Sequence, residues 1–174
     1  MRFILGNGKQ LKEKLQDFPS PWVNWLLAAK ILVIGVIDEN VVGAFGVRGA
    51  LNMTTAYVRE KYRGQGIGRQ LFEKAIRVAR ERGIHFLTGE AFSENNKALH
   101  LCLESGSKVV KRVEERKTIL LLWPLTSQGD FTYKLLRTIG SIVPGELLAR
   151  ITDWRRARAH AAYQHGRRGK CMHA

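Results

Sequence analysis

The amino-acid sequence predicts an α/β fold with a C-terminal helical extension. Through residues 1–125, short β-branched and apolar stretches alternate with segments of helical periodicity. A Gly-rich turn joins one of these stretches to a long amphipathic helix. From residue 126 onward the pattern changes to helical segments with many arginines. We therefore expect one α/β domain over residues 1–125 and a basic helical extension over residues 126–174.

The net charge of this sequence is unusual, although its composition is that of a globular protein. Apolar residues make up 45% and charged residues 25%, which are ordinary values. The net charge of +14 comprises +8 from residues 1–125 (20 basic, 12 acidic) and +6 from residues 126–174 (9 basic, 3 acidic). Such basicity suits a polyanionic cofactor, RNA, an acidic protein or an anionic membrane surface, and does not choose among them.

The sequence predicts a cytoplasmic protein. Its first six residues lack the long apolar region of a signal peptide, and the apolar stretch at 22–37 is short of a membrane span. Two cysteines, Cys102 and Cys171, provide no disulfide framework and indicate a reducing compartment.

Seven strands are expected from β-branched and apolar stretches that are bounded by turn residues. They cover residues 3–5, 31–37, 41–47, 52–58, 85–92, 109–116 and 117–125. The stretch 31–37 is nearly all apolar, as a buried strand should be, and Asp38-Glu39-Asn40 predicts a hairpin turn after it. Gly43 and Gly46 in the next strand are consistent with a bulge.

Four helices are expected within the domain. They cover residues 10–18, 22–29, 69–82 and 95–104. The first has Leu11, Leu15 and Phe18 on one side at helical spacing. The third has an inward face of five apolar residues: Leu71, Phe72, Ala75, Val78 and Ala79. Arg82-Gly83 is a suitable end for this third helix.

The turn Arg63-Gly64-Gln65-Gly66-Ile67-Gly68 connects the strand at 52–58 to the helix at 69–82. Its glycines lack the Cβ atoms that hold a ligand away from the backbone, and they allow positive φ. Unpaired N–H groups and the helix dipole favour an anion at such a helix N-terminus. No Lys-Ser/Thr pair follows, so the turn is no P-loop, and its glycine spacing differs from the dinucleotide fingerprint. The turn predicts a phosphate cradle, with a plain Gly-rich connection as the alternative.

This turn resembles the pyrophosphate loop of the GNAT N-acetyltransferases, Arg/Gln-x-x-Gly-x-Gly/Ala, at Arg63, Gly66 and Gly68. A second family motif, Asn-x-x-Ala-x-x-x-Tyr-x-x-x-Gly-Phe, is matched at three positions and departs at two. The matching residues are Asn95, Ala98 and Gly106, whereas Cys102 and Ser107 replace the Tyr and the Phe. The order of expected elements also agrees with the family. The resemblance covers residues 1–125 and implies a central mixed, mostly antiparallel sheet flanked by helices.

The resemblance implies acetyl-CoA, or a longer acyl-CoA, as co-substrate, and no metal. In the family, acyl-CoA enters a V-shaped gap between the fourth and fifth strands. The strand residues implied to line the pantetheine arm are Ala56, Tyr57 and Val58, which serve equally well as strand core. The amide of Val58 would polarise the thioester carbonyl. The other implied cofactor-binding residues are Arg63, Gly64, Gln65, Gly66, Ile67, Gly68, Arg69 and Asn95.

Attack of an amine on a thioester needs a proton acceptor for the amine, and an acid can protonate the departing thiolate. Many relatives keep a Glu on the fourth strand, whereas this strand has none and Glu90 on the fifth is the nearest carboxylate. His85, His100 or a water chain are alternative bases. Cys102 stands at the position of the family's Tyr, where a thiol could act as the acid or could simply pack. Covalent transfer through Cys102 would need an adjacent base, which the helical spacing to His100 does not provide.

The extension carries two amphipathic stretches separated by Pro144-Gly145. The first has an apolar stripe formed by Phe131, Leu135, Leu136, Ile139, Ile142 and Val143. The second, at 147–161, has an apolar face and an opposite face with Arg150, Arg155, Arg156 and His160. The tail at 165–174 is expected to be disordered. The extension could pack on the domain as a helical hairpin, or contact an acyl carrier protein, RNA or an anionic membrane surface.

The function implied by the resemblance is acyl transfer from acyl-CoA to the primary amine of a small molecule or peptide. One alternative is a non-catalytic acyl-CoA-binding module, because the family's Glu and Tyr are missing. Others are an acyltransferase that acts on RNA, or one that takes its acyl group from an acyl carrier protein. A homodimer is also left open.

Overall fold

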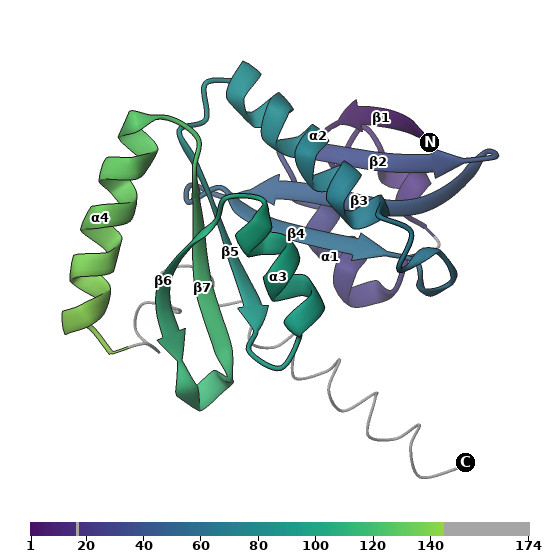
Figure 1. Cartoon of the computed structure of the whole chain (residues 1–174). Helices are drawn as coiled ribbons and strands as arrows, with labels where there is room; N and C mark the ends of the chain where they lie inside the picture. Colours follow the sequence, from purple (N-terminus) through teal and green to yellow (C-terminus); the bar gives the residue numbers. More distant parts are fainter. Residues whose placement is uncertain (17, 145–174) are drawn as a thin grey trace, which may run out of the picture.

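The computed structural model describes residues 1–16 and 18–144 as one sheet covered by helices on both faces (Figure 1). The seven strands are β1 (Arg2–Gly6), β2 (Ile31–Ile37), β3 (Asn40–Arg48), β4 (Met53–Val58), β5 (Phe86–Phe92), β6 (Lys108–Val113) and β7 (Thr118–Pro124). Their order in the sheet is β1-β2-β3-β4-β5-β7-β6, and only the β4–β5 pair is parallel. The predicted mixed, mostly antiparallel sheet is confirmed.

Four helices accompany the sheet: α1 (Ser20–Leu27), α2 (Ile67–Glu81), α3 (Asn96–Glu104) and α4 (Ser127–Ile142). Three short 3-10 turns complete the described elements: η1 (Lys12–Leu15), η2 (Glu60–Tyr62) and η3 (Glu114–Arg116). The predicted second helix of the extension, at 147–161, and the tail at 165–174 lie outside the described residues. Among the residues that the structure describes, no helix is long and apolar enough to cross a membrane.

The predicted helix at 10–18 is wrong in type, because the chain forms only the 3-10 turn η1 there. Its backbone bonds join residues three apart, as from Phe18 N to Leu15 O at 3.0 Å. Pro19, which follows at once, has no N–H to extend a ladder. The inward placement of Leu15 and Phe18 is nevertheless as expected, since both are buried.

The predicted bulge in β3 is present. Gly35 of β2 pairs with Gly43 and Val36 pairs with Val41, so Val42 of β3 is the extra residue, next to Gly43. The predicted strand at 109–116 is also shorter than expected. It ends at Val113, and η3 then leads into Lys117, whose φ of 51° turns the chain back into β7.

The two faces of the sheet are covered by different helices (Figure 1). On one face α2 buries its five predicted apolar residues over the central strands, and α3 packs beside it over β5. The other face is covered by η1 and α1 at the β3–β4 side and by α4 at the β5–β7–β6 side. Each face of the sheet therefore has one helix on either side of the β4–β5 junction.

Strands β4 and β5 touch at one end only. Their register contains a single Cα pair, Met53 with Thr88, at the N-terminal end of β4. Thr54 Oγ1 donates to Thr88 O at 3.0 Å, and Thr88 Oγ1 donates to Leu51 O at 2.8 Å. Beyond this junction the two strands diverge, so the predicted gap between the fourth and fifth strands is present.

Helix α4 packs closely on the sheet. Lys111 of β6 donates from Nζ to the carbonyls of Gly140 and Val143 at 2.7 and 2.6 Å, which fixes the C-terminal end of the helix. Gly129 is buried at the N-terminal end, where a Cβ atom would lie 2.1 Å from His85 O. The first part of the extension is thus in contact with the domain, and the division at residue 125 stays a prediction.

Replacing Gly129 with Ala should lower the free energy of unfolding. A helical Gly→Ala change on its own is worth roughly 0.5–1 kcal/mol of stabilisation, but here the new methyl group meets backbone atoms that cannot move aside. We expect a net loss of about 2 kcal/mol or more by denaturant unfolding. Thr138→Ala, at an exposed position of the same helix, should stay within about 0.5 kcal/mol of the parent. Equal stability of the two variants would contradict close packing of α4 on β5.

Candidate functional site

The edge of β4 that faces the gap has its backbone groups turned toward the gap. Arg59 N donates to Val42 O of β3 at 2.9 Å, and successive residues of a strand point their N–H groups to opposite edges. The N–H and C=O groups of Val58, and by the same alternation those of Ala56, therefore face the gap. Ala56 is exposed although it lies within a strand. Their assignment to the pantetheine arm stays a prediction.

The side chain of Tyr57 lies on the opposite face of the sheet. Its ring packs edge-on against Phe18, with the centroids 5.2 Å apart, and lies 5.7 Å from the ring of Trp22. This side chain therefore does not line the gap on the α2 face, and the N–H and C=O groups of Tyr57 point to β3 by the same alternation. This aromatic cluster could not be predicted from local spacing, because Tyr57 of β4 is remote in the sequence from Phe18 and Trp22.

Arg63 closes the turn onto β4. Its Nε donates to Val58 O at 3.0 Å, its Nη1 lies 3.3 Å from Glu60 Oε1, and its guanidinium lies 5.8 Å from the centre of the Tyr57 ring. The side chain that the sequence placed at the loop entrance therefore ties the loop to the end of the strand. This contact also occupies the Val58 carbonyl and leaves the Val58 N–H as the group directed into the gap.

The three glycines of the turn serve two purposes. Gly64 and Gly66 have φ values of 80° and 72°, and a Cβ atom at either would meet nothing within 4 Å, so conformation is what requires glycine there. Gly68 is helical, and a Cβ atom on it would lie 3.6 Å from Leu101 Cδ2 and 3.9 Å from Val58 Cγ2. The end of β4, the start of α2 and the middle of α3 thus converge on Gly68.

The N-terminus of α2 is suited to an anion. No side chain caps it, and its first turn has no acidic residue, whereas Asn95 caps α3 and Thr126 caps α4. The first-turn amides and the dipole favour negative charge there. Gln65, next to this turn, is exposed, and its Nε2 lies 3.4 Å from Lys61 O.

Arg69 stands in the first turn of α2, where a cation opposes the helix dipole. It forms an ion pair with Glu104 of α3, and His100 Nδ1 lies 3.2 Å from the same carboxylate. All three side chains are largely exposed. Glu104 is a partner that sequence reasoning missed, since no local spacing rule connects positions 35 residues apart.

Asn95 lies at the mouth of the gap but already has a structural role. Its Oδ1 accepts from Ala98 N at 3.2 Å, which caps α3. A contact from this side chain to a cofactor would therefore come from Nδ2. An Asn at this position is therefore expected both from the family motif and from the preference for Asn as a helix N-cap.

Glu90 and Cys102 lie on opposite faces of the sheet. On β5, Leu87 and Ala91 pack into the core under α2, so Glu90 between them points to the other face, in register with Leu120. Cys102 of α3 packs against the core under α2. Glu90 is half-buried and lies beyond the Met53–Thr88 junction, on the diverging part of β5. The two predicted catalytic residues therefore lie on opposite faces of the sheet, and their catalytic roles stay predictions.

Burial determines the ionisation of Cys102. Desolvation raises the pKa of its thiol from 9.0 to about 11. The thiol therefore stays protonated at neutral pH, as an acid must and as a thiolate nucleophile must not. This favours the predicted acid role over covalent transfer. Ser107, where the family has Phe, is buried next to it, and the Ser107 hydroxyl has no hydrogen-bond partner among the described residues.

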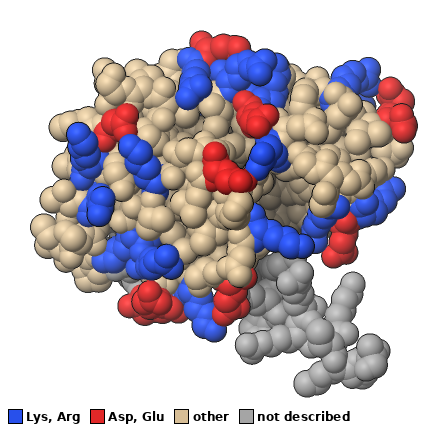
Figure 2. Space-filling model, in the orientation of Figure 1, with Lys and Arg blue, Asp and Glu red and all other residues tan. Residues whose placement is uncertain are grey.

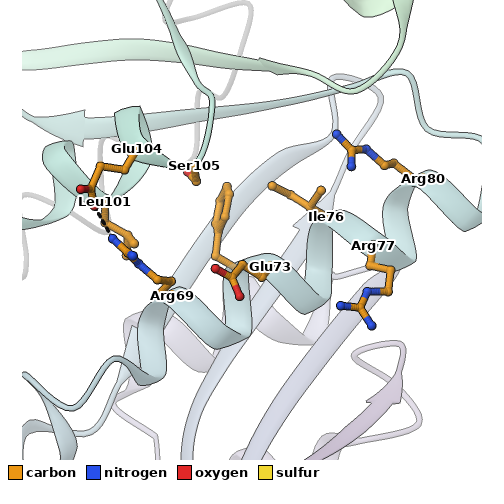
Figure 3. Close-up of a pocket in the computed structure, with 9 residues that line it drawn as sticks. Arg69, Glu73, Ile76, Arg77, Arg80, Leu101, Glu104 and Ser105 are labelled. Atoms are coloured by element: carbon orange, nitrogen blue, oxygen red, sulfur yellow. Dashed lines mark hydrogen bonds and ion pairs between the residues drawn. The ribbon is translucent and has the colours of Figure 1, made fainter.

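A groove of about 660 Å³ runs between α2 and α3 (Figure 3). It is lined by three arginines, two glutamates and a mainly apolar floor: Arg69, Phe72, Glu73, Ile76, Arg77, Arg80, Leu101, Glu104 and Ser105. Of these only Arg69 belongs to the predicted cofactor residues, and its ion pair with Glu104 crosses the groove (Figure 3). The space-filling view shows a separate hollow beside the C-terminal end of β4, bordered by Lys and Arg side chains (Figure 2).

Among the residues that the structure describes, no three His, Cys, Asp or Glu side chains come together as metal ligands.

Comparison with known proteins identifies the family. The model of the acetyltransferase (GNAT) family matches residues 8–106, more than half of the chain. This protein therefore belongs to the acetyltransferase (GNAT) family. A search of curated proteins gave no match.

Solved structures with the same fold include three that share 15–19% sequence identity with this chain. An acetyltransferase from Bacillus subtilis in complex with CoA superposes with a TM-score of 0.57 at 15% identity, covering 72% of this chain and 99% of its own. The ribosomal-protein-S18-alanine N-acetyltransferase from Escherichia coli gives 0.55 at 16%, covering 72% and 95%. A GNAT acetyltransferase from Elizabethkingia anophelis with acetyl-CoA bound gives 0.52 at 19%, covering 63% and 86%. At these identities the likeness shows the shared fold.

The raised pKa of Cys102 predicts slow alkylation. At pH 8, the thiolate fraction of a thiol with a pKa of about 11 is roughly a hundredth of that of a thiol with a pKa of 9.0. In a Cys171→Ser protein, iodoacetamide should therefore react with native Cys102 about 100-fold more slowly than with a thiol of unshifted pKa. The rate should keep rising about tenfold per pH unit up to pH 10. The same chain unfolded in guanidinium serves as the control and should level off near pH 9. A native-state rate that levels off near pH 9 would refute the desolvated thiol.

Proposed function

We propose that this protein is an N-acyltransferase that moves an acyl group, most simply acetyl, from acyl-CoA to a primary amine. The observation that carries this proposal is the divergence of β4 and β5, which leaves the N–H of Val58 directed into a gap beside the uncapped N-terminus of α2. The gap offers strand-like hydrogen bonds to a pantetheine arm, and the helix N-terminus offers amides to a pyrophosphate. The family membership agrees with this assignment.

Each end of the cofactor has its own set of residues in this proposal. The backbones of Ala56 and Val58 hold the arm. The amides from Gly66 to Arg69 hold the pyrophosphate, with Gly64 and Gln65 shaping the turn and Arg63 anchoring it. When acyl-CoA is bound it supplies the activated acyl group, and the Val58 N–H stabilises negative charge on the carbonyl oxygen.

The chemistry uses both faces of the sheet. The amine approaches on the face of Glu90, where that carboxylate takes up its proton directly or through one water. The carbon–nitrogen bond forms as the carbon–sulfur bond breaks, and Cys102, on the other face, gives its proton to the departing thiolate. A thiol of pKa about 11 is a weak acid for this task. Transfer to a thiolate of ordinary pKa, about 8.5, would be uphill by a few kcal/mol. The desolvation that raises the pKa of Cys102 would also raise that of a thiolate in the same gap, which narrows the difference.

A non-catalytic acyl-CoA-binding module is the second candidate. It is favoured by the absence of a carboxylate from β4 and by the weak acidity of Cys102. This candidate predicts cofactor binding without turnover, so it differs from the first in a measurable way.

The cofactor assignment is tested by Gly68→Val. Space exists for a Cβ atom at Gly68, between Leu101 and Val58, and the two further methyl groups of Val would fill the space where the start of α2 meets the end of β4. We expect acetyl-CoA binding, measured by titration calorimetry, to weaken about tenfold or more, or at least 1.4 kcal/mol. Gln70→Val, an exposed position of the same helix, is the matched control and should bind as the parent does. Equal affinities in the two variants would place the pyrophosphate elsewhere.

The chemical assignment is tested with a panel of amines and acetyl-CoA, by following release of free CoA. Glu90→Gln should lower kcat by about 100-fold, and Cys102→Ala by about tenfold, with acetyl-CoA binding unchanged. Glu94→Gln removes an exposed carboxylate that pairs with Lys117 and should leave the rate as it was. Turnover that survives both site substitutions would assign the proton transfers to water. Tight acetyl-CoA binding without turnover of any amine would favour the second candidate.

A further inference from the structure

Helix α4 presents an apolar stripe to solvent. Its four members are exposed to 68% (Phe131), 49% (Leu135), 37% (Ile139) and 80% (Ile142). Spacings of four, four and three residues place them on one side of the helix. Of the other exposed large apolar residues of the described chain, Met1 and Leu5 lie at the N-terminal strand β1 and Leu103 lies on α3. A contiguous stripe of this kind marks a contact surface, whereas scattered residues do not.

The orientation of this stripe is fixed by the packing of the helix. Tyr133 donates from its hydroxyl to Val109 O at 3.3 Å, and Val143 packs with Val113 and Leu120 of the sheet. The only acidic residue of the helix, Asp130, is paired with Lys108 of β6 at 2.7 Å. The stripe therefore faces away from the domain, at the outer edge of the molecule (Figure 1).

The chain that follows α4 carries a matching stripe. Pro144-Gly145 comes directly after the C-cap Val143, and Leu147, Ile151 and Trp154 then recur at spacings of four and three. A turn of a few residues between two helices makes them antiparallel neighbours. In that arrangement the two stripes meet in four layers: Ile142 with Leu147, Ile139 with Ile151, Leu135 with Trp154, and Phe131 with Arg158. The last layer would place a guanidinium over an aromatic ring.

We propose that the stripe on α4 is the docking surface for residues 147–158 of the same chain, which pack on it as an antiparallel helix. The apolar side chains of both segments are then covered. On such a helix Arg156 would lie opposite the stripe, and Arg150 and Arg155 would flank it on either side.

The size of the stripe favours this occupant over a second copy of the protein. The four side chains expose on the order of 400 Å², about half of the ~800 Å² per partner in a standard stable interface. A segment tethered by a short turn is present at high effective concentration and does not lose the translational freedom of a separate molecule. A small stripe is therefore sufficient for the tethered segment and insufficient for a dimer.

Cysteine cross-linking of the full-length chain tests the proposal. In a Cys171→Ser background, Ile139→Cys with Ile151→Cys should form a disulfide within one chain under mild oxidation. The control pairs Ile151→Cys with Arg137→Cys, which is exposed but lies two residues away from both Leu135 and Ile139, off the stripe. The control should cross-link about tenfold more slowly or less.

Hydrogen exchange provides a second readout that does not depend on disulfide geometry. Amides of residues 147–158 should be protected in the parent and in Lys134→Glu, and should lose that protection in Leu135→Glu. Three results would overturn the proposal. The first is a disulfide that joins two chains, which would assign the stripe to a second copy. The second is absence of both cross-link and protection. The third is protection that appears only with phosphatidylserine vesicles, which would assign the stripe to an anionic membrane surface.

Discussion

The fold depends on one short parallel junction. Met53 and Thr88 form the only Cα pair between β4 and β5, and hydrogen bonds from Thr54 and Thr88 hold the two strands together at that end. Pinned at one end and free at the other, the strands must diverge. Phe72 of α2 spans the division, with its ring 5.0 Å from Phe45 of β3 and 5.0 Å from Trp123 of β7. The two halves of the sheet are thus connected by the threonine hydrogen bonds at the junction and by the ring of Phe72, which packs against both halves.

Everything in the candidate site follows from that divergence. Backbone groups that would pair with a neighbouring strand are instead directed into the gap, and the turn after β4 brings the N-terminus of α2 to its mouth. Because side chains alternate along a strand, the gap separates Glu90 on one face from Cys102 on the other. On its own face, burial raises the pKa of the Cys102 thiol.

Local sequence patterns predicted the strands, α2 and the Gly-rich turn, because each depends on spacing within a few residues. Gly64, Gly66 and Gly68 could be recognised for that reason. The pairing of Arg69 with Glu104 could not be predicted, since 35 residues separate them. The same holds for the contact of Arg63 with the Val58 carbonyl and for the aromatic ring pair of Tyr57 with Phe18. The helix predicted at 10–18 failed because periodicity does not distinguish a 3-10 turn from an α-helix when Pro19 ends the segment.

The helices also define how two substrates could reach the gap without colliding. On the face of Cys102, the gap lies between α2 and α3, where the uncapped helix N-terminus is suited to a phosphorylated cofactor. On the face of Glu90, it lies between α1, with its aromatic cluster around Tyr57, and α4. Under the proposed mechanism the amine therefore enters between α1 and α4. The inner side of α4 bounds that entrance, and its outer side carries the apolar stripe. Under the two proposals, the inner side of α4 therefore borders the acceptor site, and its outer side binds the basic segment at 147–158.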